Sequence, residues 1–186
     1  MEKVRIGILG CANVAKKHVI SALKEINIAE LKWIASRDKE KAKRWAQEFS
    51  IPLSGLYEEL ISSKDVEAIY IPLPIGLHEK WVVRAANAKK HIICEKSLAQ
   101  NYSAVQEMIS VCKKNDVVLF ENFMCAYHSQ HEKAKEAIAK GELGDPVVFT
   151  GHFGFPPLNE DNFRYSKELG GGRLNDVGTY PVFMSR

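Results

Sequence analysis

The sequence predicts an α/β fold, in which a doubly wound parallel sheet is followed by the start of an α+β domain that the 186 residues do not complete. Apolar runs of strand length alternate with amphipathic runs of helix length up to residue 120, which is typical of a parallel sheet with helical crossovers. Beyond residue 121 this alternation stops. We therefore expect one complete domain at residues 1–121 and the N-terminal part of a second domain at residues 122–186.

The composition is that of an ordinary globular protein and argues against several kinds of partner. Hydrophobic residues make up 46% of the chain, enough for a sizeable core. The net charge of +3 is not concentrated in a basic block, so we expect neither nucleic acid nor a membrane as a partner. Scattered cysteines without a C-x-x-C pair, and no signal peptide, predict a cytoplasmic location. We also expect no metal, because His128 and His131 have no further ligands nearby.

The first strand and the turn that follows it organise the rest of the chain. Residues 4–9 are mostly apolar, and apolar spacing predicts a helix at 13–25. Small residues between them let backbone N–H groups approach a pyrophosphate, which the positive end of the helix also attracts. The predicted cofactor contacts are Gly10, Cys11, Ala12, Asn13 and Val14, with Ala12 at the second glycine of the G-x-G-x-x-G/A pattern. The alternative is that these small residues serve only the geometry of the turn.

A second strand at 31–35 ends in a sequence that bears on the choice of cofactor. A carboxylate at this strand end usually holds the ribose hydroxyls of NAD, whereas a hydroxyl followed by an arginine suits the 2′-phosphate of NADP. Ser36 and Arg37 therefore favour NADP, with NAD still possible. The alternative is that Ser36 or Asp38 only caps the helix at 39–49 and that Arg37 is solvated.

A rigid loop is expected at the carboxyl end of a later strand. Strands at 51–53 and 66–71 flank a short helix, and the loop Pro72-Leu73-Pro74-Ile75-Gly76-Leu77-His78 follows them. Ligands of doubly wound sheets bind at this edge, so Leu73 and Pro74 should touch the cofactor. His78 either contacts the cofactor as well or caps the helix at 77–87.

The strand at 91–94 ends in Glu95-Lys96-Ser97. A lysine at the edge of a sheet is more commonly a solvated charge. Here, however, Glu95 and Lys96 follow a strand on the same rim as Gly10, where a nicotinamide would lie, and we place both in the site. A helix at 103–115 and a strand at 117–120 complete a unit of about six strands, the usual size of a dinucleotide-binding domain.

The second domain is expected to begin with a helix at 128–140, which a turn at 141–146 joins to a strand of alternating character at 147–155. A loop follows this strand. Three glycines at 170–172 then precede a helix that starts near Leu174.

Polar side chains of this C-terminal segment are candidates for the site. Asp176 and Tyr180 lie four residues apart, so the last helix presents both on one face. Pro181 should distort that helix just past Tyr180. Arg164 either contacts the cofactor or the substrate, or lies at the surface.

Three motifs together make the chain resemble the Gfo/Idh/MocA oxidoreductase family over essentially all of its length. They are the loop at 10–15, the segment Glu95-Lys96-Ser97, similar to the family's E-K-P motif, and Gly170-Gly171-Gly172-x-x-x-Asp176-x-Gly178-x-Tyr180, similar to its G-G-G-x-x-x-D-x-G-x-[HY] motif. The resemblance implies an NAD(P)-dependent oxidoreductase of sugars, cyclitols or related diols. Tyr180 resembles the branch of dimeric dihydrodiol dehydrogenases, D-xylose dehydrogenases and glucose–fructose oxidoreductases, in which the matching lysine and tyrosine are the catalytic pair.

The chain departs from the family pattern in two places. Ser97 replaces a proline, which frees the backbone after Lys96. Family members also continue past the tyrosine helix through an open antiparallel sheet, which covers the active site and commonly forms a dimer interface. Only the first strand of that sheet is expected here, and a strand is not stable alone. We therefore expect a fragment of a longer polypeptide, which would form a homodimer.

The resemblance also implies a reaction. Oxidation of a secondary alcohol needs a hydride acceptor, which nicotinamide supplies, and a group that takes the hydroxyl proton. Tyr180 would take it if the Lys96 ammonium lies within about 4–6 Å and favours the phenolate. Asp176 would bind a substrate hydroxyl or orient Lys96. The sequence thus predicts an NADP-dependent dehydrogenase or reductase of a sugar or diol. The alternative is an NADP-binding sensor, or a catalytically inactive fragment of such an enzyme.

Overall fold

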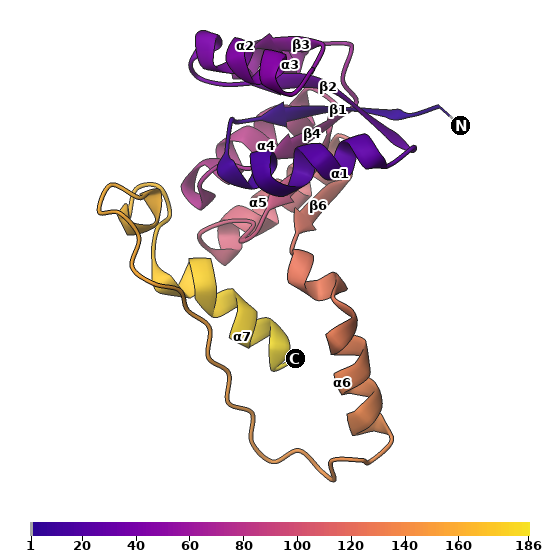
Figure 1. Ribbon diagram of the computed structural model, residues 1–186, viewed down its shortest axis with the longest axis vertical. Coiled ribbons are helices and arrows are strands. Elements are labelled where there is room, and N and C mark those ends of the chain that lie inside the picture. Colours follow the sequence, from indigo (N-terminus) through magenta and orange to yellow (C-terminus); the bar gives the residue numbers. More distant parts are fainter. Residues whose placement is uncertain (1) are drawn as a thin grey trace.

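The computed structural model describes residues 2–186, and a parallel sheet lies at the centre of its N-terminal part (Figure 1). The six strands are β1 (Val4–Leu9), β2 (Ala29–Ala35), β3 (Leu53–Gly55), β4 (Ala68–Ile71), β5 (His91–Glu95) and β6 (Leu119–Asn122). Their order is β3-β2-β1-β4-β5-β6, and every neighbouring pair is parallel. The strand order reverses between β1 and β4, as in doubly wound dinucleotide-binding sheets. The predicted fold class is confirmed.

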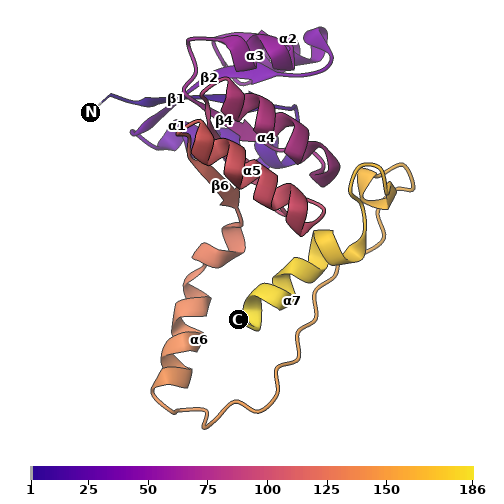
Figure 2. The same ribbon diagram turned by 180° about the vertical axis from the view of Figure 1, so that it is seen from behind.

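Helices cover both faces of the sheet (Figures 1 and 2). They are η1 (Ala15–Val19), which continues into α1 (Ile20–Glu25), α2 (Lys39–Glu48), α3 (Tyr57–Ser62), η2 (Ile75–Leu77), α4 (His78–Asn87) and α5 (Tyr102–Lys114). One buried cluster joins Ile20 of α1 and Ala46 of α2 to the sheet. The other joins α3, α4 and α5, which contribute Leu60, Val82 and Met108, to the opposite face. Because both faces are covered, β4 is buried along its whole length and β1 is buried from Ile6 to Leu9.

The register of the strands brings the ends of four strands, β1, β2, β4 and β5, to one edge of the sheet. Leu9 of β1 pairs with Ala35 of β2, and Ile71 of β4 pairs with Cys94 of β5. The residues that follow these strand ends therefore lie along one rim. This rim is the carboxyl edge, at which doubly wound sheets bind their ligands.

The remainder of the chain extends away from the sheet as two helices joined by a long loop (Figures 1 and 2). Its elements are η3 (Met124–Tyr127), α6 (Ser129–Ala139), η4 (Phe163–Tyr165), η5 (Leu174–Gly178) and α7 (Thr179–Met184). The buried ring of His131 on α6 lies 5.7 Å from the ring of Phe183 on α7. Phe123, just after β6, lies 4.9 Å from Phe183. These aromatic contacts fix α7 against the start of this segment.

The strand predicted at 147–155 is not formed. This stretch has no regular secondary structure, and Val147 and Val148 are 90% and 82% exposed. A strand is stable only when neighbouring strands bind its backbone and cover one of its faces. No other strand pairs with 147–155 among residues 2–186, so its alternating apolar side chains have nothing to pack against.

The distortion expected at Pro181 is present but lies before Tyr180, not after it. The helix continues through Pro181 to Met184, whereas residues 174–178 form a π-helical turn. A proline ring collides with the carbonyl four residues earlier, here that of Val177, and this relation explains why the preceding turn widens. The prediction placed the distortion on the wrong side.

No helix among residues 2–186 has both the length and the apolar character that a membrane span requires.

Candidate active and cofactor-binding site

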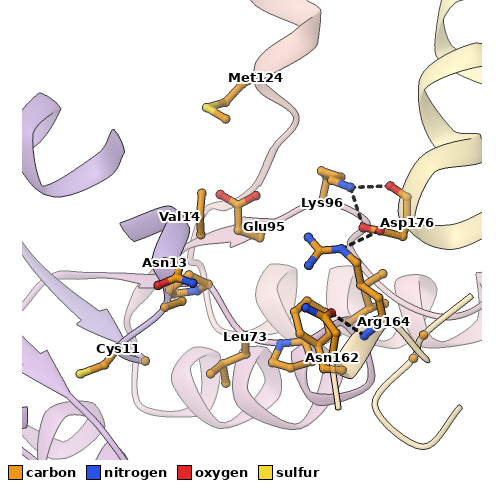
Figure 3. Close-up of a pocket in the computed structure, with 18 of the residues that line it drawn as sticks. Cys11, Asn13, Val14, Leu73, Glu95, Lys96, Met124, Asn162, Arg164 and Asp176 are labelled. Carbon is orange, nitrogen blue, oxygen red and sulfur yellow. Dashed lines mark hydrogen bonds and ion pairs between the residues drawn. The ribbon is translucent and has the colours of Figure 1, made fainter. Parts of the chain in front are cut away.

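A cavity of about 640 Å³ lies between the carboxyl edge of the sheet and the C-terminal segment (Figure 3). All but one of the predicted site residues line it. They are Gly10, Cys11, Ala12, Asn13, Val14, Ser36, Arg37, Leu73, Pro74, Glu95, Lys96, Arg164, Asp176 and Tyr180. Residues far apart in the sequence therefore meet in one place, as the three motifs predict.

The turn after β1 has the shape of a phosphate cradle. Gly10 adopts a φ of +131°, which favours glycine, and a Cβ there would lie 2.8 Å from a methyl carbon of Leu73. The next helix begins at residue 13, so its first N–H groups have no helical partner and face the turn. Burial raises the pKa of the Cys11 thiol to about 11, so this side chain stays neutral. The loop thus presents backbone donors and no side-chain negative charge to a bound anion.

Polar and cationic side chains gather at the end of β2. The buried Ser36 hydroxyl accepts a hydrogen bond from the Asp38 N–H at 3.2 Å. Asp38 caps α2, as the alternative interpretation allowed, because its carboxylate accepts from two backbone N–H groups of the first turn. Arg37 and Lys41 both line the cavity. This end of the cavity therefore offers a hydroxyl and two cations, which suits a phosphate.

The prediction that His78 contacts the cofactor is wrong. The side chain is fully buried and does not line the cavity. Its Nε2 lies 2.7 Å from the Leu73 carbonyl oxygen, and its Nδ1 lies 3.0 Å from the Ser97 carbonyl oxygen. Burial lowers the pKa of His78, so the neutral ring donates from one nitrogen only. The ring fills the space between the loop at Leu73 and the loop at Ser97. It makes no capping hydrogen bond to α4, so the alternative role is not observed either.

Glu95 lies at the end of β5, beside Val14 and Lys96 (Figure 3). Its Oε1 accepts two hydrogen bonds of 2.6 Å, one from the Tyr70 hydroxyl and one from the Asn122 amide. Tyr70 and Asn122 come from β4 and β6, the strands on either side of β5. Three adjacent strands thus hold this carboxylate in place.

Lys96 and Arg164 both bind Asp176. The Lys96 ammonium donates to the backbone carbonyl of Asp176 and to its Oδ1 at 3.2 Å. The Arg164 guanidinium donates to Oδ2 at 2.7 Å (Figure 3). The side chains of Lys96 and Asp176 are only 16% and 12% exposed, so solvent screens this ion pair less than a surface pair. The Asp176 carboxylate therefore connects its own helical turn both to Lys96 at the sheet edge and to the loop that carries Arg164.

Tyr180 lies against the same lysine. The Lys96 Nζ is 4.9 Å from the centre of the Tyr180 ring. The ring stacks on Phe153 at 4.4 Å and lies 5.3 Å from Phe123. Two apolar rings thus pack against the phenol, and the Lys96 ammonium lies over its ring.

Two glycines bring the segment that carries Asp176 onto the sheet edge. The Gly76 N–H donates to the Leu169 carbonyl at 3.0 Å. Gly170 is buried at a φ of +79°, and a Cβ there would lie 2.6 Å from the Gly76 nitrogen. The two backbones touch because neither residue has a side chain.

Family models match both parts of the chain. Residues 4–123 match the model described as an oxidoreductase family with an NAD-binding Rossmann fold. Residues 131–186 match the GFO/IDH/MocA C-terminal domain. The chain belongs to the Gfo/Idh/MocA oxidoreductase family. The resemblance inferred from the three motifs is confirmed.

Two relatives of this Gfo/Idh/MocA chain are named for reactions of sugars. D-xylose 1-dehydrogenase (NADP(+)) 2 of Haloferax volcanii is 40% identical over 182 residues, which are 97% of this chain and 55% of the relative. dTDP-3,4-didehydro-2,6-dideoxy-alpha-D-glucose 3-reductase of Saccharopolyspora spinosa is 37% identical over 183 residues, 98% of this chain and 55% of the relative. The chain spans just over half the length of these relatives.

A solved structure shares the arrangement. The crystal structure of a 3-ketoreductase from Actinomadura kijaniata, in complex with NADP and TDP-benzene, superposes with a TM-score of 0.94 at 34% identity. The match covers 97% of this chain and 56% of that protein. The Gfo/Idh/MocA architecture is thus present in the part of the chain that the structure describes.

Several cavity residues of this Gfo/Idh/MocA chain were missed by sequence reasoning. They are Lys41, Tyr57, Pro72, Ile75, Met124, Phe153, Phe155, Asn162, Phe163, Gly170 and Gly171. Lys41 could have been found, because it lies four residues after Arg37, at the start of the helix that follows it. No local signal distinguishes Met124 or Phe153 from other apolar residues, since only the fold brings them to the cavity.

The structure describes no candidate metal centre within residues 2–186, where no three or more histidine, cysteine or acidic side chains converge. His128 instead accepts a hydrogen bond from the Gln130 N–H at the start of α6.

Proposed function

We propose that this protein is an NADP-dependent oxidoreductase that interconverts a secondary alcohol and a ketone or lactone on a sugar or vicinal diol. The observation that carries the proposal is the convergence of Lys96, Asp176 and Tyr180 on the cavity that also contains the turn at Gly10. A protein that only senses a cofactor does not need a cation and a phenol side by side. The chemistry of the site therefore favours an enzyme.

NADP fits the donor set of the cavity. The cradle after β1 offers backbone N–H groups, and Ser36, Arg37 and Lys41 offer a hydroxyl and two cations where a 2′-phosphate can bind. No carboxylate lies among the cavity residues that follow β2, where an NAD-preferring fold has one. The name of the Haloferax relative and the ligands of the Actinomadura structure support the same cofactor. When bound, nicotinamide supplies the hydride acceptor or donor.

Lys96 and Tyr180 are proposed to handle the proton of the substrate hydroxyl. In oxidation, the Tyr180 phenolate takes the hydroxyl proton while the alcohol becomes a carbonyl. In reduction, the Tyr180 hydroxyl gives that proton back, and the Lys96 ammonium stabilises negative charge on the oxygen. Asp176 acts as a positioning residue, because its carboxylate binds Lys96 and Arg164 and so fixes both cations at the cavity.

Apolar residues of the cavity support a ring compound as the substrate. Phe153 stacks on Tyr180, and Phe155 and Met124 also line the cavity, so the C–H face of a sugar or diol ring can pack on apolar surface. The names of the relatives, which include a D-xylose dehydrogenase and a dTDP-sugar reductase, support a sugar.

The test is a turnover assay of the full-length protein with a panel of aldoses, vicinal diols and nucleotide-linked keto-sugars, followed by the absorbance of NADPH. We expect turnover with at least one ring compound that carries a secondary alcohol or ketone, and faster turnover with NADP than with NAD. Binding of NADP without turnover across the whole panel would favour the sensor instead.

A further inference from the structure

Glu95 is a carboxylate whose two oxygens have different surroundings. Oε1 accepts from the Tyr70 hydroxyl and from the Asn122 amide, both at 2.6 Å. Oε2 has no hydrogen-bond donor among residues 2–186, although the side chain lines the cavity. Carboxylate oxygens that are partly removed from water bind donors when these are within reach. Oε2 is therefore an acceptor without a donor from the described chain, on a side chain that lines the cavity.

No cation of the described chain neutralises this carboxylate. Lys96, the next residue, extends away from it toward Asp176 (Figure 3), and no lysine, arginine or histidine nitrogen lies within 4.0 Å of Glu95. The charge of Glu95 is instead held by two neutral donors. A carboxylate arranged in this way remains available for a donor that enters the cavity.

The two donors cannot themselves touch a ligand. Tyr70 is 2% exposed, and neither Tyr70 nor Asn122 lines the cavity. Burial and the neighbouring Glu95 charge raise the pKa of Tyr70 far above its usual value, so its hydroxyl keeps its proton and must donate. Asn122 is paired with Glu95 in the β5–β6 register, so its amide reaches the same oxygen from the other side. Both side chains act only through Glu95.

We propose that Tyr70 and Asn122 are positioning residues that fix Glu95 as an acceptor for the O–H or N–H donors of the nicotinamide half of the cofactor. This inference rests on the proposed function. Glu95 and Lys96 lie at the end of β5, whereas Ser36 and Arg37 follow β2, from which β1 and β4 separate β5 in the sheet. The adenosine half of the cofactor would bind at the β2 end. Loss of either donor should therefore weaken the binding of the nicotinamide half and leave the binding of the adenosine half unchanged.

The test compares two ligands by isothermal titration calorimetry of the full-length protein. NADP⁺ contains both halves of the cofactor, whereas adenosine 2′,5′-bisphosphate lacks the nicotinamide half. We expect Tyr70→Phe and Asn122→Leu each to weaken NADP⁺ binding roughly tenfold, the usual effect of removing a hydrogen bond to a charged group. Affinity for the bisphosphate should change by less than about twofold, because its contacts lie elsewhere. Tyr102→Phe is the matched control, since Tyr102 is 74% exposed on α5.

A second arm separates positioning from general damage to the fold. In a Glu95→Ala background, Tyr70→Phe should cause no further loss of NADP⁺ affinity, because the group that it positions is gone. An equal loss for both ligands, no loss for either, or the full Tyr70→Phe effect in the Glu95→Ala background would overturn the proposal. If the unchanged protein bound neither ligand, the cofactor site itself would be refuted, and this inference with it.

Discussion

Asp176 shows how a single side chain can determine the geometry of a site. Its carboxylate binds Lys96 through one oxygen and Arg164 through the other. The sequence predicted that Asp176 either binds a substrate hydroxyl or orients Lys96, and the contacts favour the second role. The sequence could not predict that Arg164 shares the carboxylate, because the loop that carries it has no periodic pattern.

We expect individual residues at the end of β2 to determine the choice of cofactor. Arg37→Ala removes a cation that lines the cavity and should weaken NADP⁺ binding by tenfold or more, on the order of the contribution of a charge-assisted contact, while NAD⁺ binding changes little. Lys41→Ala should show the same selectivity. Calorimetric titration with each cofactor measures the effect. Equal losses for NADP⁺ and NAD⁺ would mean that these side chains do not bind the 2′-phosphate.

The thiol in the phosphate cradle gives a prediction about pH. Burial raises the pKa of Cys11 from 9.0 to about 11, so the thiolate is about a hundredfold scarcer than for an ordinary thiol at a pH below 9. Alkylation of Cys11 by iodoacetamide should be slow at about pH 8 and should accelerate as the pH rises toward 11. Peptide mass spectrometry follows the alkylation, and fast labelling at neutral pH would contradict the burial of this thiol.

The raised pKa of Cys11 also affects the stability of the fold. The contribution of the neutral thiol to the free energy of unfolding is complete below pH 9 and is lost as the pH rises through 11.

At the scale of elements, the sequence predicted the sheet well and the C-terminal segment less well. Each of the strands β1 to β6 has a local signal in the sequence, because an apolar run stands next to a turn there. The strand at 147–155 has the right alternation but no partner among the described residues, so pattern alone misled the prediction. His78 was misplaced for a related reason, since a loop histidine that fills a buried gap and one that contacts a ligand look the same in sequence.

The contact between the turns at Gly76 and Gly170 should contribute to the free energy of unfolding. Gly170→Ala places a Cβ 2.6 Å from the Gly76 nitrogen at a φ of +79°, so we expect a loss of about 2 kcal/mol or more in the free energy of unfolding. Gly141→Ala is the matched control, because Gly141 has a φ of +73° but nothing lies within 4 Å of its Cβ position. That variant should lose only about 1 kcal/mol. Chemical denaturation measures both, and equal losses would show that the turns are not in tight contact.

At the scale of the whole molecule, the cavity joins two parts of the chain that are distant in sequence. Gly10 and Glu95 come from the sheet, whereas Arg164 and Asp176 come from the C-terminal segment. The motifs predicted this meeting because the family resemblance covers both parts. Composition and periodicity alone could not have predicted it, since they carry no information about contacts between distant segments.

Cofactor binding should therefore slow hydrogen exchange in both parts of the chain. Hydrogen exchange measured by mass spectrometry should show that saturating NADP⁺ slows exchange roughly fivefold or more in peptides that cover residues 10–14 and in peptides that cover residues 164–176. Peptides from residues 143–150, which do not line the cavity, serve as the control. Protection of residues 10–14 alone would show that the C-terminal segment does not close the cofactor site.

The central claim is that Lys96 and Tyr180 act on the proton of the substrate hydroxyl beside a bound cofactor. The most direct measurement is the turnover of Lys96→Met and Tyr180→Phe variants of the full-length protein, with NADP⁺ affinity determined on the same samples. We expect turnover to fall by about 10²- to 10⁴-fold in each variant, the usual contribution of a positioned acid or base, while affinity changes by less than about threefold. Unchanged turnover in either variant would contradict the account.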